Sequence, residues 1–396
     1  LIKMAFKYSQ NVETKVIDAS NYVANRYVEF KLDEEEVNYL SDIRLINLGC
    51  TAANTPIYNA LGGAINLIKH IELLDGREVL CSARHISPYL AFQQTRQPNE
   101  KNKSVSNFLQ KSDYGYQALY GGIKTGGDPA TVQADDTTPV SHISLRDCLP
   151  LLERTPALST DMFKNLRIRI EFETSPQKVI STADAITTTE PSLCVDIVRG
   201  KMAMPSQVAW LEIEHDEYIL QGENPSTANQ PKKIETSVRL NGFNNKYVER
   251  MLLVKQFDDL TKYGTSHIVK NGSLALFKEE FQVRVNGSNV FATILDKDCV
   301  RSNIMEDAWG VLNVVQHFNK CYTTDDLLAG SQVGLTDYTG CVLADAVKDL
   351  QIQHNRSCIN DSATDSKPNS VMKVHVYAEC RKVLNMKGGD YQVLYA

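Results

Sequence analysis

The chain has 396 residues, of which 42% are hydrophobic and 23% are charged, and its formal net charge at pH 7 is −6. This is the composition of an ordinary globular protein, and the length suits two domains of roughly 100–200 residues better than one. The acidic balance excludes a global attraction to nucleic acid, no apolar run reaches the roughly 20 residues of a membrane span, and the first residues lack the apolar segment of a secretion signal.

Nine cysteines are scattered along the chain, and none belongs to a Cys-x-x-Cys pair. A disulfide framework is typical of much smaller secreted proteins. We therefore expect reduced, mostly buried thiols in a protein made in a reducing compartment.

The first quarter of the chain begins without a pattern and then alternates. Residues 1–24 show no sustained period and are predicted to form an N-terminal arm held only by contacts with something else. Residues 27–32 and 42–48 predict strands. Ile65 to Leu80 reads as strand, turn, strand, and Asp75-Gly76 predicts a type I′ turn.

A short helix is predicted over 86–97, followed by a long polar loop at 98–141. A second short helix is predicted over 144–153, with Ser144 as its N-cap and Pro150 bending it or ending it early. The clearest strand covers 166–173, where Leu, Ile and Phe alternate with Arg and Glu. Further strands are predicted at 193–198 and 208–214.

Periodicity is lost at 221–236, which contains Gly222, Pro225 and Pro231. The predicted domains are therefore an arm at 1–24, a first domain at 25–222, a linker at 223–236 and a second domain at 237–396. The second domain is predicted to hold strands at 247–254, 372–377 and 391–395, helical fragments at 324–328 and 343–350, and a hairpin at 281–291 that turns at Asn286-Gly287.

The two halves look like repeats of one plan. The hairpin turns lie 286 − 75 = 211 positions apart, and the late strands that begin at Leu166 and Val371 lie 371 − 166 = 205 positions apart. Many short strands with long loops and few helices are typical of antiparallel sandwiches. The predicted fold class is all-β, with two consecutive eight-stranded antiparallel jelly rolls and short helices in the loops.

Residues with chemical potential show no site pattern. No histidine has zinc-ligand spacing, the pairs Gly121-Gly122 and Gly126-Gly127 lack the Lys-Ser/Thr of a phosphate loop, and Glu34 to Glu36 and Asp135-Asp136 read as solvated charge. Arg167 and Arg169 are predicted to pair with the nearby Glu171 and Glu173 rather than to bind nucleic acid.

One acid/base cluster is kept as a candidate: His215, Asp216 and Glu217. Asparagines in Asn-x-Ser/Thr patterns carry little weight without a secretion signal, and Asn286 is explained by its turn. They are Asn102, Asn271, Asn286, Asn355 and Asn360. The sequence itself predicts no catalytic, cofactor or metal residues.

The order of several stretches resembles the double jelly-roll major capsid proteins of double-stranded DNA viruses, most of all those of polinton-like viruses and virophages. The resemblance is carried by Ala60 to Leu80 with Ser87 to Thr95, by His142 to Phe172, Asn241 to Gln256, Phe281 to Phe291, and Met372 to Ala396.

That resemblance implies a non-enzymatic structural protein without cofactors. It implies homotrimers that form pseudo-hexagonal capsomers, contacts with neighbouring capsomers and with penton and minor or cement proteins, and a place in the virion shell with a membrane beneath it in some viruses. A secreted double jelly-roll glycan-binding protein or glycan amidase is the alternative, and a minor vertex protein is a lesser variant. Fold alone does not separate these classes.

Overall fold

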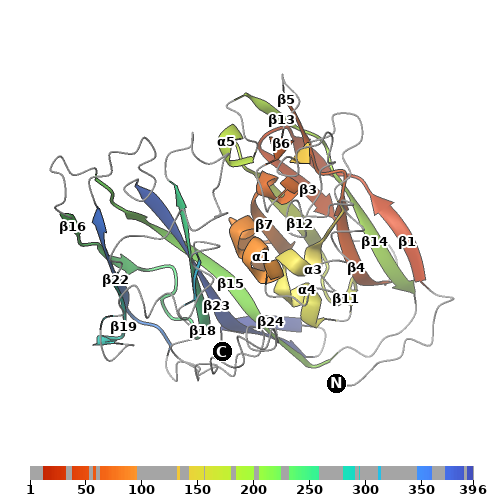
Figure 1. Cartoon of the computed structure of the whole chain (residues 1–396). Coiled ribbons are helices and arrows are strands. Elements are labelled where there is room, and N and C mark those ends of the chain that lie inside the picture. The colour runs from red at the N-terminus through yellow and green to blue at the C-terminus, as the bar shows by residue number, and fades with distance from the viewer. Residues whose placement is uncertain are drawn as a thin grey trace, which may run out of the picture.

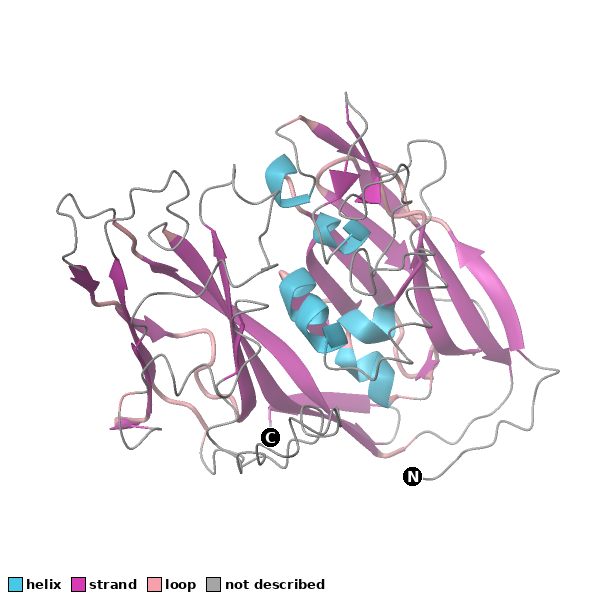
Figure 2. Cartoon of the chain, viewed as in Figure 1, coloured by secondary structure: helices cyan, strands magenta, loops and turns pink. Residues whose placement is uncertain are grey.

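The computed structural model describes residues 12–32, 38–52, 57–58, 63–95, 132–133, 142–155, 157–179, 184–199, 205–223, 232–257, 280–289, 294, 311–313, 346–358, 371–387 and 390–395. Within these residues the chain is built mainly of antiparallel strands, with a few short helices (Figures 1 and 2). No described helix is long and apolar enough to cross a bilayer.

The first half contains two five-stranded sheets. The outer sheet in Figure 1 has the order β1 (Val12–Ile17), β14 (Ser192–Arg199), β4 (Asn38–Ile46) and β10 (His142–Ser144), and β11 (Leu158–Ser159) also pairs with β4. The other sheet has the order β2 (Asn21–Val23), β3 (Tyr27–Lys31), β12 (Leu166–Phe172), β7 (Ile68–Asp75) and β8 (Glu78–Arg84).

Shorter elements complete this half. The two-stranded pairs are β13 (Ile186–Thr188) with β5 (Cys50–Ala52) and β6 (Ile57–Tyr58) with β9 (Val132–Gln133). The helices are η1 (Gly63–Leu67), α1 (Ile86–Thr95), α3 (Leu145–Cys148), α4 (Pro150–Arg154) and α5 (Pro176–Val179).

The second half also contains two five-stranded sheets. One has the order β15 (Gln207–Leu220), β23 (Met372–Lys387), β18 (Val248–Phe257) and β21 (Val311–Asn313), and β24 (Asp390–Tyr395) pairs with β23. The other has the order β16 (Lys232–Ile234), β22 (Leu350–Cys358), β19 (Glu280–Val285) and β20 (Ser288–Asn289), and β17 (Ser237–Leu240) also pairs with β22.

Both halves have one strand order. Eight strands of the first half, in chain order, are β1, β3, β4, β7, β8, β10, β12 and β14. Its sheets pair them as first–eighth–third–sixth and second–seventh–fourth–fifth. The same two orders arise in the second half from β15, β17, β18, β19, β20, β21, β22 and β23. Two facing four-strand sets connected in this way are a jelly roll, so the predicted fold class is confirmed.

The pairing of strands differs from the predicted domain bounds in three segments. β1 and β2 lie within the predicted arm of 1–24, yet they pair with β14 and β3, so the expectation of an arm without sheet contacts is wrong for these strands. β15 lies within the predicted first domain of 25–222, yet it pairs over its full length with β23. The predicted linker of 223–236 includes β16, a strand that pairs with β22.

The two hairpins occupy the same place in the strand order, but their turns differ. β7 ends at Asp75 and β8 begins at Glu78, so the two turn residues are Gly76 and Arg77. Of these only Gly76 has positive φ, at 60°, which matches a type II′ turn and corrects the expected type I′. Asn286 (φ 50°) and Gly287 (φ 83°) both have positive φ, as a type I′ turn requires. The return strand expected through Val290 and Phe291 lies outside the described residues.

The structure agrees with only part of the helix predictions. The first is α1, which begins at Ile86 as expected. The second is two short helices, α3 and α4, because Leu149 before Pro150 is extended, and Ser144 makes no side-chain cap bond. The predicted fragment at 343–350 is wrong where it is described, since Leu350 begins β22. The fragment at 324–328 lies outside the described residues.

Alternating side chains build two large cores among the described residues, and Tyr39, Ala157 and Val198 form a third, small cluster. In β12 Leu166, Ile168 and Ile170 are fully buried, whereas Arg167 and Arg169 face outward. One core fills the first half and continues onto the β15–β23 sheet through Trp210 and Tyr377, and the other lies within the second half. The β15–β23 sheet is therefore covered on both faces. Burial on both faces explains why β23 is buried almost continuously.

Candidate functional site

The junction between the two halves is formed by β15 and β23 on one side and by β8, α1 and α4 on the other (Figure 1). Met372, Val374 and Val376 of β23 enter the second core. Successive side chains of a strand point to opposite faces, so His375, Tyr377 and Glu379 face the first half. This alternation places polar side chains at a buried contact.

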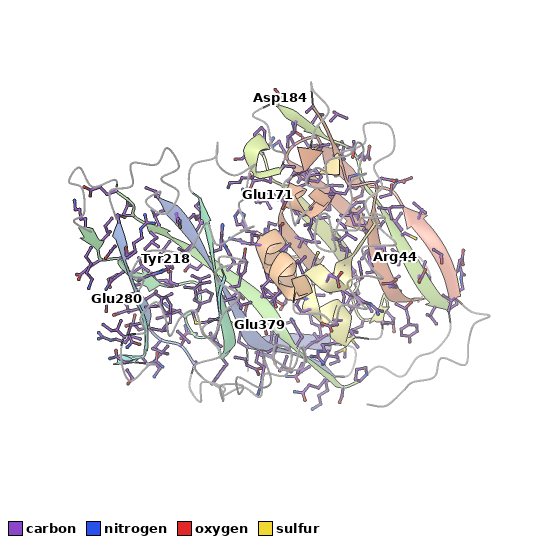
Figure 3. The ribbon with its side chains drawn as sticks, viewed as in Figure 1. Arg44, Glu171, Asp184, Tyr218, Glu280 and Glu379 are labelled. Atoms are coloured by element: carbon purple, nitrogen blue, oxygen red, sulfur yellow. The ribbon has the colours of Figure 1, made fainter. Side chains whose placement is uncertain are left out.

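Two tyrosines join the halves across this contact. The hydroxyl of Tyr89, on α1, donates a hydrogen bond of 2.8 Å to Glu379 Oε1, and both side chains are buried. The hydroxyl of Tyr377 donates to the backbone oxygen of His85. Figure 3 labels Glu379 in this region and Tyr218 deeper in the second half. The junction is thus held by directional bonds as well as by apolar packing.

Glu212 of β15 is the second polar anchor and is only 1% exposed. Its Oε1 accepts from the backbone N–H of Ser82 at 2.7 Å, and its Oε2 accepts from Trp210 Nε1 at 2.6 Å. Lys382 Nζ lies 3.4 Å from Oε1, so the carboxylate has both a cation and two neutral donors. A buried carboxylate with this many partners is a structural tie, because an ionised group is tolerated in a protein interior only when it is paired.

A cluster of histidines lies on the same face of the sheet. Glu217 of β15 is directly opposite His375 of β23, and His215 is two residues away on the same side. His215 Nε2 lies 2.9 Å from His375 Nδ1, and His375 Nδ1 lies 3.7 Å from Glu217 Oε2. The ring of His85, which precedes α1, lies 5.1 Å from that of His215 and 5.8 Å from that of His375.

Burial keeps these imidazoles neutral. It lowers the pKa of His215 to about 3, with smaller contributions from neighbouring His85, Arg84 and Lys373. Burial also lowers the pKa of His375 well below its usual range and lowers that of His85. At neutral pH the cluster therefore presents neutral ring nitrogens beside one carboxylate, which accepts from Lys373 Nζ at 3.0 Å through its other oxygen.

The three residues of the sequence candidate His215-Asp216-Glu217 lie on β15, where neighbouring side chains point to opposite faces of the sheet. His215 and Glu217 face the first half, whereas Asp216 Oδ2 accepts from the backbone N–H of Gly242 at 3.1 Å. A Cβ at Gly242 would lie 3.0 Å from that oxygen, so a larger residue there would push the Asp216 carboxylate aside by a few tenths of an ångström. No sequence pattern joins His375 and His85 to the candidate, since they lie 160 and 130 positions from His215 and meet it only through folding.

The remaining histidines do not gather. His70 lies on β7, 3.5 Å from Glu72, and His142 begins β10. His354 is fully buried on β22, where its Nδ1 lies 2.6 Å from the hydroxyl of Tyr218. His267 and His317 lie outside the described residues.

The arginines of β12 contact mainly the neighbouring strand β3. Arg167 Nη1 lies 3.0 Å from Glu29 Oε1 of β3, and the guanidinium of Arg169 lies 5.4 Å from the ring centre of Tyr27. Glu171 pairs with Lys69 of β7 at 2.7 Å. The predicted pairing holds in part: the pKa of Glu171 is lowered by Lys69 first and to a smaller extent by Arg169. Glu173, by contrast, is buried and pairs with Lys178, so the prediction is wrong for that residue.

The structure describes some of the other sequence candidates, and the rest lie outside the described residues. Asn355 is 1% exposed, and its Nδ2 lies 3.2 Å from Glu280 Oε2, so it is no glycan acceptor in the folded chain. The described cysteines are free thiols, and all but Cys194 are buried. The glycine pairs and acidic runs lie outside the described residues, together with Asn102, Asn271, Asn360, Cys299, Cys321 and Cys341.

No family model matches the sequence, and a search of curated proteins finds no significant match. Solved structures do match. A crystal structure of PBCV-1 VP54 fitted into a reconstruction of the virophage Sputnik aligns over 100% of this chain and 99% of that one, with a TM-score of 0.64 and 12% identity. This chain has the double jelly-roll fold of viral major capsid proteins.

Two further capsid structures agree. The Sputnik virophage structure gives a TM-score of 0.56 at 9% identity, covering 98% of this chain and 88% of that one. The mavirus major capsid protein gives 0.51 at 8% identity, covering 96% and 90%. Tandem carbohydrate-binding modules and the protein PNGF-II each reach only 0.18, so the glycan-related alternative gains no support from them.

Proposed function

We propose that this chain is a major capsid protein of a double-stranded DNA virus. The observation that carries the proposal is the repeated strand order: two complete jelly rolls follow one another, and the whole chain aligns with whole capsid proteins. We further propose that the division between the two domains lies between β14 and β15, at about residues 200–206, because this places eight strands of matching order on each side.

The proposed assembly is a homotrimer whose six jelly rolls form a pseudo-hexagonal capsomer. Neighbouring capsomers, a penton protein and minor or cement proteins are its proposed partners in the virion, with a membrane beneath the shell in some arrangements. Cyclic symmetry repeats each subunit contact three times, so individually modest interfaces add to a stable shell unit. A net charge of −6 fits a protein that surrounds a genome without sequence-specific binding.

We also propose that the chain has no enzymatic role. Its buried polar groups at the junction are satisfied by one another, as the bonds of Glu212 and Glu379 illustrate. Groups that act on a substrate need a cleft with access for it.

The test is the solution mass of the purified chain, measured by light scattering after size exclusion. A mass near three times 44.3 kDa, or larger shell fragments, is expected, followed by hexagonal particles in electron micrographs. A monomer over a wide concentration range would overturn the proposal. Glycan-array binding and glycan amidase activity in that monomer would support the alternative class.

A further inference from the structure

The three side chains His215, Glu217 and His375 form a group whose ligand atoms all lie within 4.8 Å of one another, unlike any other such group among the described residues. The group is not made by sequence spacing. It arises because β15 and β23 pair in a register that sets Glu217 opposite His375 and His215 on the diagonal.

We propose that these three residues bind a transition-metal ion, zinc in the first instance. The ligands are His215 Nε2, His375 Nδ1 and one oxygen of Glu217, and a water molecule would take the fourth position. Two imidazoles and a carboxylate are a set that zinc prefers, whereas calcium and magnesium prefer oxygen ligands alone.

The distances fit a tetrahedral ion. Zinc bonds of about 2.0–2.1 Å place two ligand atoms roughly 3.3–3.4 Å apart. The two ring nitrogens are 2.9 Å apart, and His375 Nδ1 is 3.7 Å from Glu217 Oε2, so the observed separations lie on either side of that value. The third pair, His215 Nε2 and the Glu217 oxygen, lies within 4.8 Å, and rotation of the partly exposed Glu217 side chain would bring the three atoms to the spacing that the ion needs.

The surroundings suit a bound metal. The backbone on both sides of the ligands is held by the continuous β15–β23 ladder. Glu217 keeps one oxygen on Lys373 Nζ, which fixes the carboxylate and directs the other oxygen toward the histidines. The Glu217 side chain is 40% exposed, whereas His375 is 4% exposed, so the ion would enter from the Glu217 side.

The charges around the three ligands determine how tightly the site is expected to bind a metal ion. Burial holds both imidazoles in the neutral form. Their facing nitrogens share one hydrogen bond, so the ring that donates it would move its proton to its other ring nitrogen when the ion binds. Lys373 and Arg84 add positive charge near His215, which opposes a divalent ion and which the carboxylate of Glu217 offsets in part. We therefore expect a site weaker than the four-ligand sites of structural zinc domains, and one that is not required for folding.

The chain provides a matched control. His70 and Glu72 on β7 repeat the His-x-Glu pattern of His215 and Glu217. The residue on the neighbouring strand opposite His70 is Arg84, whereas the proposed site has His375 on its neighbouring strand. A cation in that position repels a metal ion. His70→Asn should leave metal binding unchanged.

The test uses the full chain without a histidine tag. Titration calorimetry with Zn²⁺ alone should give one ion per chain, Co²⁺ should add visible absorption bands, and Zn²⁺ should raise the unfolding temperature by a few degrees. His215→Asn should reduce the affinity at least tenfold, and so should Glu217→Gln, which alters a partly exposed side chain and leaves the fold intact.

The results decide the matter in either direction. One ion per chain, weakened by both variants and unaffected by His70→Asn, would establish the site. No binding, or binding of equal strength in His215→Asn and Glu217→Gln, would overturn it. Because binding is measured on the purified chain, its failure would not affect the capsid proposal, which rests on the mass of the assembly.

Discussion

Tyr89 on α1 and Glu379 on β23 lie 290 residues apart in the chain and share a buried hydrogen bond of 2.8 Å. The bond ties the first half to the last long strand. We predict that Tyr89→Phe lowers the free energy of unfolding by about 1–3 kcal/mol, because a buried acceptor loses a donor. Urea unfolding measures this. Tyr27→Phe is the control, since the Tyr27 hydroxyl accepts only an exposed bond from Asn21, and it should cost less than about 0.5 kcal/mol. Equal losses in both variants would contradict the role of the junction.

Glu212 should be the costliest polar side chain at the junction. Glu212→Ala would leave the Ser82 amide, Trp210 Nε1 and Lys382 without this acceptor, and we expect a loss of about 3–5 kcal/mol. Glu212→Gln keeps one acceptor oxygen and should lose less. The matched control is Glu249→Ala, because Glu249 pairs with Arg381 at the surface, where a pair is worth about 0–1 kcal/mol. A Glu212→Ala variant as stable as this control would contradict the prediction.

Two substitutions in the turn at Asn286-Gly287 test the effects of backbone strain and of side-chain hydrogen bonds separately. Gly287 has φ of 83° with no atom within 4 Å of an added Cβ, so Gly287→Ala meets strain but no clash, and we expect a loss of about 1–2 kcal/mol. Asn286→Gly tolerates positive φ but loses side-chain bonds to the backbone of Lys348, Asp349 and Ala346. Thermal unfolding compares the two. A Gly287→Ala variant with unchanged stability would show that the turn relaxes without strain.

Buried thiols should be protected in the folded chain. Burial raises the pKa of Cys81, Cys148 and Cys380, so little reactive thiolate forms and little reagent reaches it. We expect iodoacetamide at pH 8 to label these three at least a hundredfold more slowly than in denaturant, as read by peptide mass spectrometry. Half-buried Cys194 serves as the internal comparison and should be labelled faster. Rapid native labelling of Cys81 would contradict the buried thiols that we describe.

The sequence was sufficient for the fold class where strands alternate plainly. β12 and both hairpins follow from period-two patterns and turn residues. The 211-position offset between the hairpins reflects the repeat correctly, because each hairpin joins the fourth and fifth strands of its half. The 205-position offset does not: β12 is the seventh strand of its half, whereas β23 is the eighth of its own. β22 is the true counterpart, and its alternation of Leu350, Ile352 and His354 with glutamines was available in the sequence.

Long-range pairing explains what sequence reasoning missed. β1 is exposed along most of its length, and its Val12 and Val16 stay outside the core, so its ladder with β14 is what identifies it as a strand. The junction face of β23 carries His375, Tyr377 and Glu379, which look like a solvent-facing row until the first half covers them. The histidine cluster likewise depends on a register between strands about 160 residues apart, which no local pattern encodes.

The full-length pairing of β15 with β23 also bears on how the chain is made. β15 is synthesised about 150 residues before its partner, so a nascent chain carries it with an open edge, a feature that favours aggregation until it is paired. A polypeptide released before residue 372 would lack that partner, and the part of the first half that β23 covers, including the Tyr89 hydroxyl, would stay uncovered. A truncated chain without β23 therefore cannot pair β15 or form the hydrogen bond between Tyr89 and Glu379, so only a chain that includes the last long strand can complete the fold.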